Sequence, residues 1–327
     1  MIGVAQRRRL GARVALLAGS LALTLLALEL VARLAVPQWR GLVPQRFMTE
    51  TADGVLAGVP HFDGRVASLF GDFDVPLRLD ARGFRNPPDA DPAAPLAFVG
   101  DSFCQGWGVR AAEAYAARVA AALATPAYNY CTVGADLRDD LRIVQAWMPP
   151  RPGGATVLTV TFENDVLAYP TAAIDAATPS VQGLSRNRWS RWLMQHSALF
   201  DVATTLARQS PTIVAAVRRL GLVSGVPVVG AGGVEPIAAS VRMVERIRAA
   251  AGAGPFLVLV VPPRAGEVAF NDYDAFVAAL RAAGFDVIDP RAEPRLTITT
   301  IPRDGHWDAA MHAAIAPVIA ARLRAAR

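Results

Sequence analysis

Residues 96–108 of the chain read LAFVGDSFCQGWG. A short apolar run, Leu96–Val99, stops at Gly100-Asp101-Ser102, and an alanine-rich helical pattern follows at Ala111–Ala124. A buried strand that ends in such a turn can hold a serine nucleophile exposed on a rigid element. All three residues are also common in ordinary turns, so the function must be inferred from the remaining chain.

Short apolar segments alternate with helical patterns from this point onward. The predicted strands are Leu96–Val99, Ala127–Val133, Thr156–Thr161, Phe256–Val261 and Phe285–Ile288. The predicted helices are Ala111–Ala124, Leu137–Trp147, Ile237–Ala251, Tyr273–Ala283 and Trp307–Leu323. This alternation is typical of an α/β fold, in which a parallel sheet is covered on both faces and functional residues collect beyond the carboxyl ends of the strands.

The composition supports a large folded core and argues against several classes of protein. The chain has 53% hydrophobic and 19% charged residues, and its net charge of +5 comes almost entirely from arginine. It has no basic block interleaved with aromatic residues, so we expect no nucleic-acid partner. Two cysteines and four histidines are poor material for a zinc site or a disulfide-dense scaffold. We therefore expect no metal and no cofactor.

The first forty residues are typical of a membrane anchor. Arginines at positions 7–13 precede an apolar pattern of about 23 residues, long enough to cross a bilayer, that includes Glu29 and Arg33. These two residues can pair on a helix or extend toward the interface. A cleaved signal peptide is the alternative, but no convincing cleavage site precedes Pro37. The arginines predict a single-pass protein of the cytoplasmic (inner) membrane, with its amino terminus inside and its larger part in the periplasm or outside the cell.

Three regions follow from these patterns. Residues 1–40 form the cytoplasmic stub and transmembrane anchor, and residues 41–94, rich in Pro, Gly and Asp, form an extended spacer. Residues 95–327 form the α/β domain, which is interrupted by an insertion at about 168–233.

The insertion contains two tryptophans, Trp189 and Trp192, among arginines in helical spacing. A basic amphipathic helix of this kind can lie on a membrane surface or cover the crevice of the sheet. We favour the plainer interpretation, in which the tryptophans belong to a core and the arginines form a solvated face.

Four short signals occur where strands are predicted to end or where the last helix begins. They are Gly100-Asp101-Ser102, Gly134, Asn164 and Asp304-Gly305-His306. A serine hydroxyl needs a base, for which His306 is the candidate, and Asp304 can orient the imidazole ring. Acyl transfer also creates an oxyanion, for which the backbone N–H groups of Ser102 and Gly134 and the Asn164 amide are candidate donors. Singly, these residues are also ordinary turn or helix-capping residues, and Asp101 is interpreted as one.

Together and in this order, the four signals resemble those of the SGNH (GDSL-type) hydrolase superfamily, in a membrane-anchored bacterial form. The resemblance covers Pro76 to the carboxyl terminus and includes the Gly83–Arg85 segment. It implies a flavodoxin-like three-layer sandwich with a central parallel sheet, preceded by one transmembrane helix. It also implies a catalytic Ser102, His306 and Asp304, and an oxyanion hole formed by Ser102, Gly134 and Asn164.

This chain departs from the pattern of the superfamily at three points. One residue separates Asp304 from His306, where many members have two. Phe162 lies where a glycine is frequent, two residues before Asn164. Met311 also replaces a frequent glycine, so we interpret the following residue, His312, as structural.

Two other motifs fit less well. The α/β-hydrolase elbow requires Gly-x-Ser-x-Gly, but Cys104 is the second residue after Ser102. A dinucleotide-binding fingerprint through Gly106 and Gly108 would have to follow its strand directly, whereas the Gly-Asp-Ser turn intervenes.

The two cysteines, Cys104 and Cys131, are expected near the site if the first two strands are neighbours. Outside the cytoplasm they can form a disulfide. We favour two buried free thiols, because cysteine is often a small core residue.

These observations predict a membrane-anchored, extracytoplasmic serine esterase. Its substrate is an ester-bearing glycan, lipid or small acyl ester, and the acyl group passes to water or, in O-acyl transfer, to or from a cell-envelope polysaccharide. The alternative is a catalytically weak or inactive SGNH-like domain that acts as a structural or binding subunit with other membrane proteins. The insertion and the departures at Phe162 and Met311 keep this alternative open.

Overall fold

The computed structural model of the protein describes residues 4–51, 55–166, 188–210, 212–213, 234–263 and 270–326. The body is built on a five-stranded sheet in the order β6-β5-β7-β8-β9. All four neighbouring pairs are parallel. In chain order this is a 2-1-3-4-5 arrangement, the flavodoxin-like doubly wound topology. The strands are β5 (Leu96–Val99), β6 (Ala127–Asn129), β7 (Ala155–Thr161), β8 (Phe256–Val261) and β9 (Asp286–Ile288).

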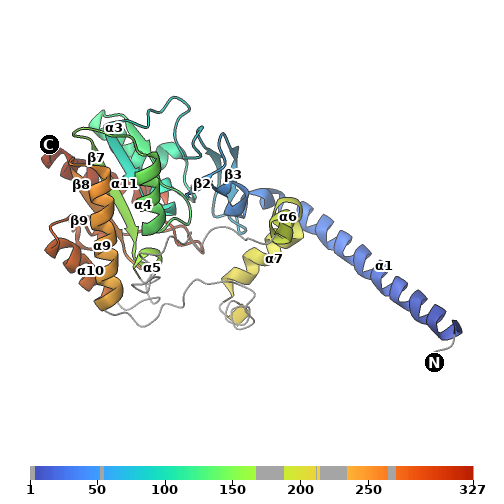
Figure 1. The fold of residues 1–327 in the computed structure, drawn as a ribbon. Helices are drawn as coiled ribbons and strands as arrows, with labels where there is room; N and C mark the ends of the chain where they lie inside the picture. The colour runs from blue at the N-terminus through green and yellow to red at the C-terminus, as the bar shows by residue number, and fades with distance from the viewer. Residues whose placement is uncertain are drawn as a thin grey trace.

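Side-chain alternation along the strands divides the core into two layers. In β5, Leu96 and Phe98 face one layer, whereas Ala97 and Val99 face the other. The first layer is covered by α3 (Tyr115–Leu123) and α11 (Ala309–Ala325). The second is covered by α4 (Leu137–Trp147), α9 (Val234–Ala251) and α10 (Phe270–Ala282), with α4 and α9 side by side (Figure 1). The predicted α/β fold with a central parallel sheet is confirmed.

One predicted strand is markedly shorter in the structure, and one predicted helix is divided. The second strand is predicted to reach Val133, but β6 ends at Asn129, whose side-chain Oδ1 accepts from the backbone N–H of Cys131 at 2.8 Å. The helix predicted at Ala111–Ala124 is divided into the short 3-10 turn η3 (Ala111–Glu113) and α3. Local side-chain bonds of this kind compete with regular backbone pairing, which explains the shorter strand.

The amino-terminal helix α1 (Val4–Ala35) projects from the body (Figure 1). Within it, Gly11–Ala35 has a mean hydropathy of 2.3 and is long and apolar enough to cross a membrane. Its large apolar side chains are exposed, with Leu16 at 75% and Leu34 at 74%. Such a surface is stable only in an apolar surrounding, so α1 is a candidate membrane span.

The region of residues 41–94, predicted to be a spacer with short extended pieces, contains two antiparallel hairpins. The first pairs β1 (Met48–Glu50) with β2 (Leu56–Gly58), and the second pairs β3 (Asp63–Ala67) with β4 (Asp74–Arg78). Their apolar side chains share a small core with Trp107 and Ile301. The hairpins therefore pack beside the segments that carry Ser102 and His306.

We expect Gly100→Ala to lower the free energy of unfolding by about 3 kcal/mol or more, because it combines backbone strain with overpacking. Gly100 has a φ of +143°, and a Cβ there would lie 2.8 Å from the carbonyl oxygen of Thr159. Gly153→Ala is the matched control, since φ is +72° but no atom in the described part of the chain lies within 4 Å of the added carbon. The control loses about 1–2 kcal/mol from φ alone.

Urea unfolding of the purified full-length variants in detergent measures both losses. Equal losses for Gly100→Ala and Gly153→Ala would contradict the close approach of β5 and β7 at this turn.

Candidate active site

Ser102 lies at the carboxyl end of β5, where the strand gives way to a one-turn helix. Gly100 turns the chain, and Asp101 caps α2 (Ser102–Gln105) by accepting the backbone N–H of Phe103 at 2.9 Å. Asp101 is therefore a capping residue, as the sequence predicted. The side chain of Ser102 is the first in α2 and lies in a buried position, with 5% of the residue exposed.

His306 reaches Ser102 from the loop that precedes α11. The Oγ atom of Ser102 lies 2.8 Å from Nε2 of His306, although 204 residues separate them in the sequence. On the other side of the ring, Nδ1 lies 2.6 Å from Oδ1 of Asp304. A carboxylate can only accept, so Nδ1 carries the proton and Nε2 is left to accept the hydroxyl proton of Ser102.

A tight turn allows Asp304 and His306 to pair across a single intervening residue. Oδ1 of Asp304 accepts the backbone N–H of His306 at 3.2 Å as well as its ring N–H. The turn is closed by the backbone N–H of Ile301, which donates to the carbonyl of His306 at 2.8 Å. Arg303 and Gly305 adopt positive φ values of +61° and +89° to form it. Aspartate commonly makes such bonds to the backbone two residues ahead.

Trp107 is a site residue that the sequence analysis missed. Its indole N–H donates to Oδ2 of Asp304 at 3.2 Å, so both carboxylate oxygens are engaged. Its ring centroid is 6.1 Å from that of His306, and the Phe103 ring is closer, at 4.7 Å. The partners are 197 residues apart, so no spacing in the sequence identifies Trp107 as the second support of Asp304.

Opposing effects set the pKa of Asp304. Burial would raise it, but the hydrogen bonds from the ring and backbone of His306 and from Trp107, with the charge of His306, hold the pKa below its ordinary value. A carboxyl with a lowered pKa stays ionised at neutral pH. Asp304 can therefore stabilise positive charge on the imidazole ring.

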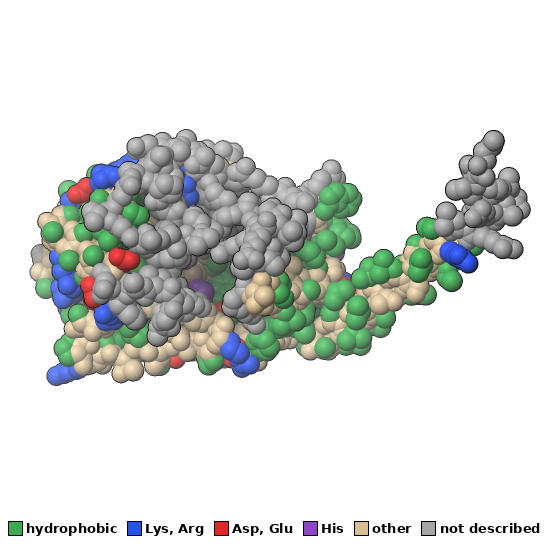
Figure 2. Space-filling view, turned by 90° about the horizontal axis from the view of Figure 1, so that it is seen from below, with side chains coloured by type: hydrophobic (Ala, Val, Ile, Leu, Met, Phe, Trp, Pro, Cys, Tyr) green, Lys and Arg blue, Asp and Glu red, His purple; other side chains and the backbone are tan. Residues whose placement is uncertain are grey.

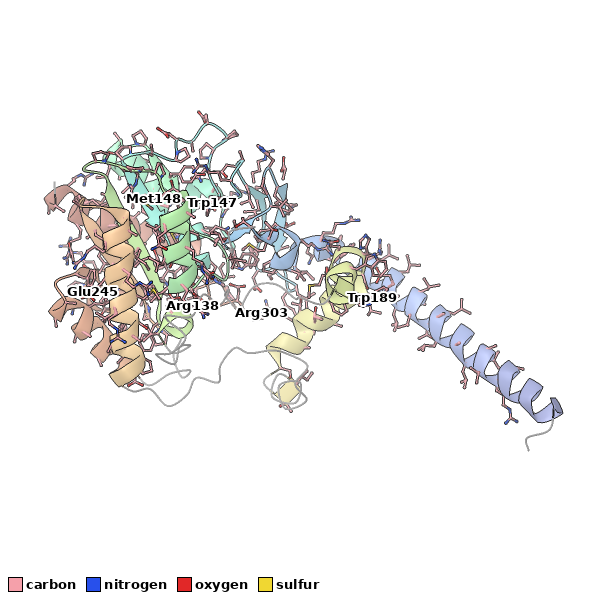
Figure 3. All side chains as sticks on the ribbon, in the orientation of Figure 1. Arg138, Trp147, Met148, Trp189, Glu245 and Arg303 are labelled. Atoms are coloured by element: carbon pink, nitrogen blue, oxygen red, sulfur yellow. A yellow bond between two sulfur atoms is a disulfide. The ribbon has the colours of Figure 1, made fainter. Side chains whose placement is uncertain are left out.

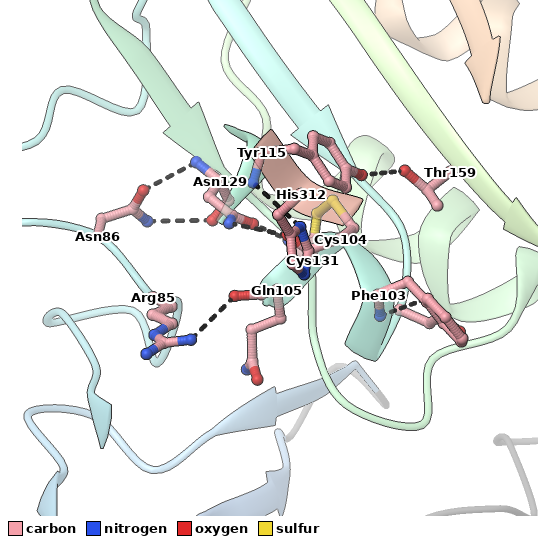
Figure 4. The surroundings of a disulfide bond; sticks show 11 residues. Arg85, Asn86, Phe103, Cys104, Gln105, Tyr115, Asn129, Cys131, Thr159 and His312 are labelled. Carbon is pink, nitrogen blue, oxygen red and sulfur yellow. Dashed lines mark hydrogen bonds between the residues drawn. A yellow bond between two sulfur atoms is a disulfide. The ribbon is translucent and has the colours of Figure 1, made fainter. Parts of the chain in front are cut away.

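Arg85, from the Gly83–Arg85 segment, holds the end of α2, the helix that begins at Ser102. Its guanidinium is buried and donates to the carbonyls of Gly106 at 2.6 Å and Val109 at 2.8 Å. A weaker bond to the carbonyl of Gln105, at 3.3 Å, is drawn in Figure 4. The last carbonyls of a helix have no partner within it, so Arg85 supplies the missing donors. This contact ties the region of residues 41–94 to the turn that carries Ser102.

The two remaining predicted oxyanion residues lie on segments next to β5. Gly134 follows β6 with a φ of +77°, and a Cβ there would meet no atom of the described residues within 4 Å. Its loop is held to the turn before Ser102 by the backbone N–H of Thr132, which donates to the carbonyl of Gly100 at 3.0 Å. Asn164 lies in α5 (Phe162–Asp165), directly after β7, but its side chain lies outside the described part of the structure. Its role as a donor stays a prediction.

Cys104 and Cys131 form a disulfide, so the favoured interpretation of two free thiols is wrong (Figure 4). Cys104 lies in α2 after β5, and Cys131 follows β6. Because β5 and β6 are paired neighbours, the two Cα atoms come within 5.6 Å, which is within the usual range for a disulfide. The bond joins α2, which begins at Ser102, to the loop that leads to Gly134.

His312 has a structural role, as expected. The residue is buried, and its Nδ1 accepts the backbone N–H of Tyr115 at 3.2 Å (Figure 4). Burial lowers the pKa of His312 to about 3, so the ring is neutral. The bond joins α3 to α11. Among the described residues, no hydrogen bond links His312 to Ser102.

Two buried carboxyl groups, Asp140 and Asp165, interact with the charge of Asp101. Burial, and then the charge of Asp101, raise the pKa values of Asp140 and Asp165 well above the ordinary range. Oδ2 of Asp165 accepts the backbone N–H of Thr161 at 2.7 Å and so fixes the turn that carries Asn164. Within the described ranges, no group of three or more His, Cys, Asp or Glu side chains is arranged to hold a metal ion.

No family model and no curated protein matches this sequence. Solved structures do resemble the chain. A carbohydrate esterase has 12% identity and a TM-score of 0.38, over 70% of this chain and 67% of its own. A family 2 carbohydrate esterase with a carbohydrate-binding domain, from Myceliophthora fergusii, has 16% identity and a TM-score of 0.36, over 74% and 67%. A lipolytic protein of the G-D-S-L family from Desulfitobacterium hafniense has 9% identity and a TM-score of 0.37, over 69% and 97%. The roles of the site residues therefore rest on the geometry described above.

The disulfide predicts that Cys104→Ser, Cys131→Ser and the double variant lose similar stability, about 2–4 kcal/mol in the free energy of unfolding, since each breaks the same bond. Urea unfolding of the full-length protein measures this loss. Mass mapping without reductant checks the bond itself. Alkylation of both cysteines after denaturation of the wild type would contradict it.

The lowered pKa of Asp304 predicts a pH-dependent loss of stability in Asp304→Asn. The pKa of this carboxyl is about 3.9 in the unfolded chain and lower in the folded protein. Its ionisation therefore stabilises the fold at pH values above the unfolded pKa, and this stabilisation is lost as the pH falls through the folded pKa. The difference in unfolding free energy between wild type and variant is therefore largest near neutral pH and narrows in acid.

Urea unfolding at a series of pH values measures this difference, with the exposed loop variant Asp89→Asn as the baseline. A difference that stays constant, or that grows toward acid, would contradict the lowered pKa.

Proposed function

We propose that this protein is a serine esterase of the SGNH (GDSL) type, in which Ser102, His306 and Asp304 form the catalytic triad. The observation that carries the proposal is the continuous chain of short contacts from Ser102 through His306 to Asp304. These three side chains lie at the carboxyl edge of a flavodoxin-like sheet, the usual position of functional sites in such folds. The order of the residues along the chain, as in the superfamily that the sequence resembles, supports the same assignment.

In the proposed reaction, Nε2 of His306 accepts the hydroxyl proton as Oγ of Ser102 bonds to the ester carbonyl carbon. The carbonyl oxygen becomes an oxyanion, which accepts from the backbone N–H groups of Ser102 and Gly134 and from the Asn164 amide. His306 then returns its proton to the leaving alkoxide as the ester bond breaks. A water molecule, deprotonated by the same ring, hydrolyses the acyl-enzyme and regenerates Ser102.

Asp304 and Trp107 support the base. The carboxylate holds the protonated Nδ1 toward itself, so that Nε2 faces Ser102, and it stabilises the imidazolium formed during attack. The indole N–H of Trp107 holds the second carboxylate oxygen and so restricts rotation of the carboxylate. The aromatic face of Phe103 against His306 limits the movement of the ring.

The protein is proposed to act outside the cytoplasm, anchored by α1. The length and hydropathy of Gly11–Ala35 support a membrane span, and the Cys104–Cys131 disulfide supports an oxidising compartment such as the periplasm. An ester carried by a glycan or lipid of the cell envelope is the proposed substrate. Its acyl group passes to water or, in an O-acyl transfer, to a sugar hydroxyl.

We expect a fluorophosphonate probe to label Ser102 in the folded, full-length protein, because the reagent reacts with a serine whose proton a base removes. Labelling is lost in Ser102→Ala and His306→Ala and retained in the matched control Ser210→Ala. Hydrolysis of short acyl esters falls by at least about 10³-fold in the same two variants.

Tandem mass spectrometry of peptides from the labelled protein identifies the modified serine, and circular dichroism checks that each variant is folded. Absence of labelling in folded wild type would contradict the esterase assignment and favour the alternative of a structural or binding subunit.

A further inference from the structure

The described part of the insertion packs against the end of α1, not over the catalytic edge of the sheet. It consists of α6 (Arg188–His196) and α7 (Ala198–Gln209), which we call the platform. Apolar residues of the platform, including Met194 and Ala198, share a buried cluster with Ala32 of α1 and with Trp39 and Leu42. In Figure 1, α6 is seen nearly along its own axis, so it lies across α1.

Glu29 of α1 holds the junction between the two platform helices. Its carboxylate accepts the backbone N–H groups of Ala198 at 2.9 Å and Leu199 at 3.0 Å, and the Ser197 hydroxyl at 2.7 Å. These N–H groups belong to the first turn of α7, where a helix has unpaired donors and a partial positive charge. Arg33 pairs with Glu29 at 2.6 Å and donates to the carbonyl of His196 at 2.7 Å.

A second ionic contact fastens the platform to the segment that follows α1. Arg46 pairs with Asp201 of α7 at 2.6 Å, and Asp201 is fully buried. The same guanidinium donates to the carbonyl of Gln195 in α6 at 3.2 Å and lies 4.5 Å from the Trp39 ring centroid. Removing one partner of a buried ion pair is costly, so the platform has a fixed position relative to α1.

The depth of the platform follows from the charges on α1. Arg13 and Arg33 are the outermost charged residues of Gly11–Ala35, and at 1.5 Å per residue they are about 30 Å apart along the helix, the thickness of a bilayer's hydrocarbon core. Arg33 and Glu29, one turn earlier, therefore lie at the outer edge of the hydrocarbon when α1 spans the membrane. Because they bind the α6–α7 junction directly, the platform lies at the same level.

The platform exposes large apolar side chains at this level. Trp189 is 68% exposed, Trp192 is 52% exposed and Leu206 of α7 is 47% exposed. The favoured interpretation of the tryptophans as core residues is therefore wrong, because the apolar side of the platform core is already filled by Met194 and its neighbours. Figure 3 places Trp189 beside the end of α1, and Figure 2 shows hydrophobic side chains that continue from the projecting helix onto the adjoining body.

We propose that the platform is a membrane-interface surface, with Trp189 and Trp192 inserted among the lipid headgroups next to the point where α1 leaves the bilayer. The proposal rests on the membrane anchoring proposed above. Tryptophan is enriched at this depth because its ring is apolar and its N–H remains hydrated. Arg40, exposed beside Trp39, adds positive charge on the same side for lipid phosphates.

The test measures lipid contact at single sites of the full-length protein in phosphatidylcholine–phosphatidylglycerol nanodiscs. An environment-sensitive fluorophore is attached through Trp189→Cys or Trp192→Cys, since the two native cysteines are bonded to each other. Lipids with a spin label near the headgroup are expected to quench both sites several-fold more than Glu245→Cys. Glu245 is an exposed residue of α9 on the far side of the body (Figure 3).

Leu21→Cys, in the middle of the apolar stretch, separates this proposal from the anchoring itself. Quenching of Leu21→Cys by chain-labelled lipid, with Trp189→Cys and Trp192→Cys no more quenched than Glu245→Cys, would overturn the platform alone. Absence of quenching at Leu21→Cys would overturn the anchoring. Adding Glu29→Ala to Trp192→Cys is expected to reduce its quenching, whereas Thr24→Ala, which removes only a bond within α1, leaves it unchanged.

Discussion

Strand β5 is hydrogen-bonded to β6 on one side and to β7 on the other, and all four of its residues are buried. This central position fixes where the chain must turn, because the next residue meets the backbone of Thr159 and has no room for a side chain. Ser102 follows at the start of α2, and the segments that follow β6 and β7 begin at the same edge of the sheet. The site therefore depends on strand order and close backbone packing before it depends on any catalytic side chain.

The sequence was sufficient to predict the sheet and the residues that meet at its edge, because both follow from local patterns. Apolar runs of four to seven residues predicted the strands, and His306 and Asp304 were identified by their position ahead of the last helix. Trp107 and Arg85 could not be identified as supports in this way, since their partners depend on the folded loop and on turn geometry. The cysteine pairing was likewise decided by strand adjacency, which the spacing alone does not give.

The two tryptophans of the platform show a different limit of sequence reasoning. Trp189 and Trp192 were assigned to a core because large aromatic residues are usually buried in water-soluble proteins. Next to an apolar helix such as α1, the surrounding solvent need not be water. Where lipid surrounds a tryptophan, its side chain no longer needs to be buried inside the protein. Glu29 and Arg33, unfavourable in a lipid-facing helix on their own, are satisfied by backbone groups of a segment about 165 residues later.

The Cys104–Cys131 disulfide closes a covalent ring with a sequence separation of 27 residues. One side of this ring carries α2, which begins at Ser102, and the other leads to the loop of Gly134. Fluctuations that would separate Ser102 from the loop of Gly134, the proposed nucleophile and oxyanion donor, must therefore stretch the ring or move both sides together. Because such bonds persist mainly in oxidising compartments, the proposed location outside the cytoplasm would also complete the covalent alignment of the proposed site.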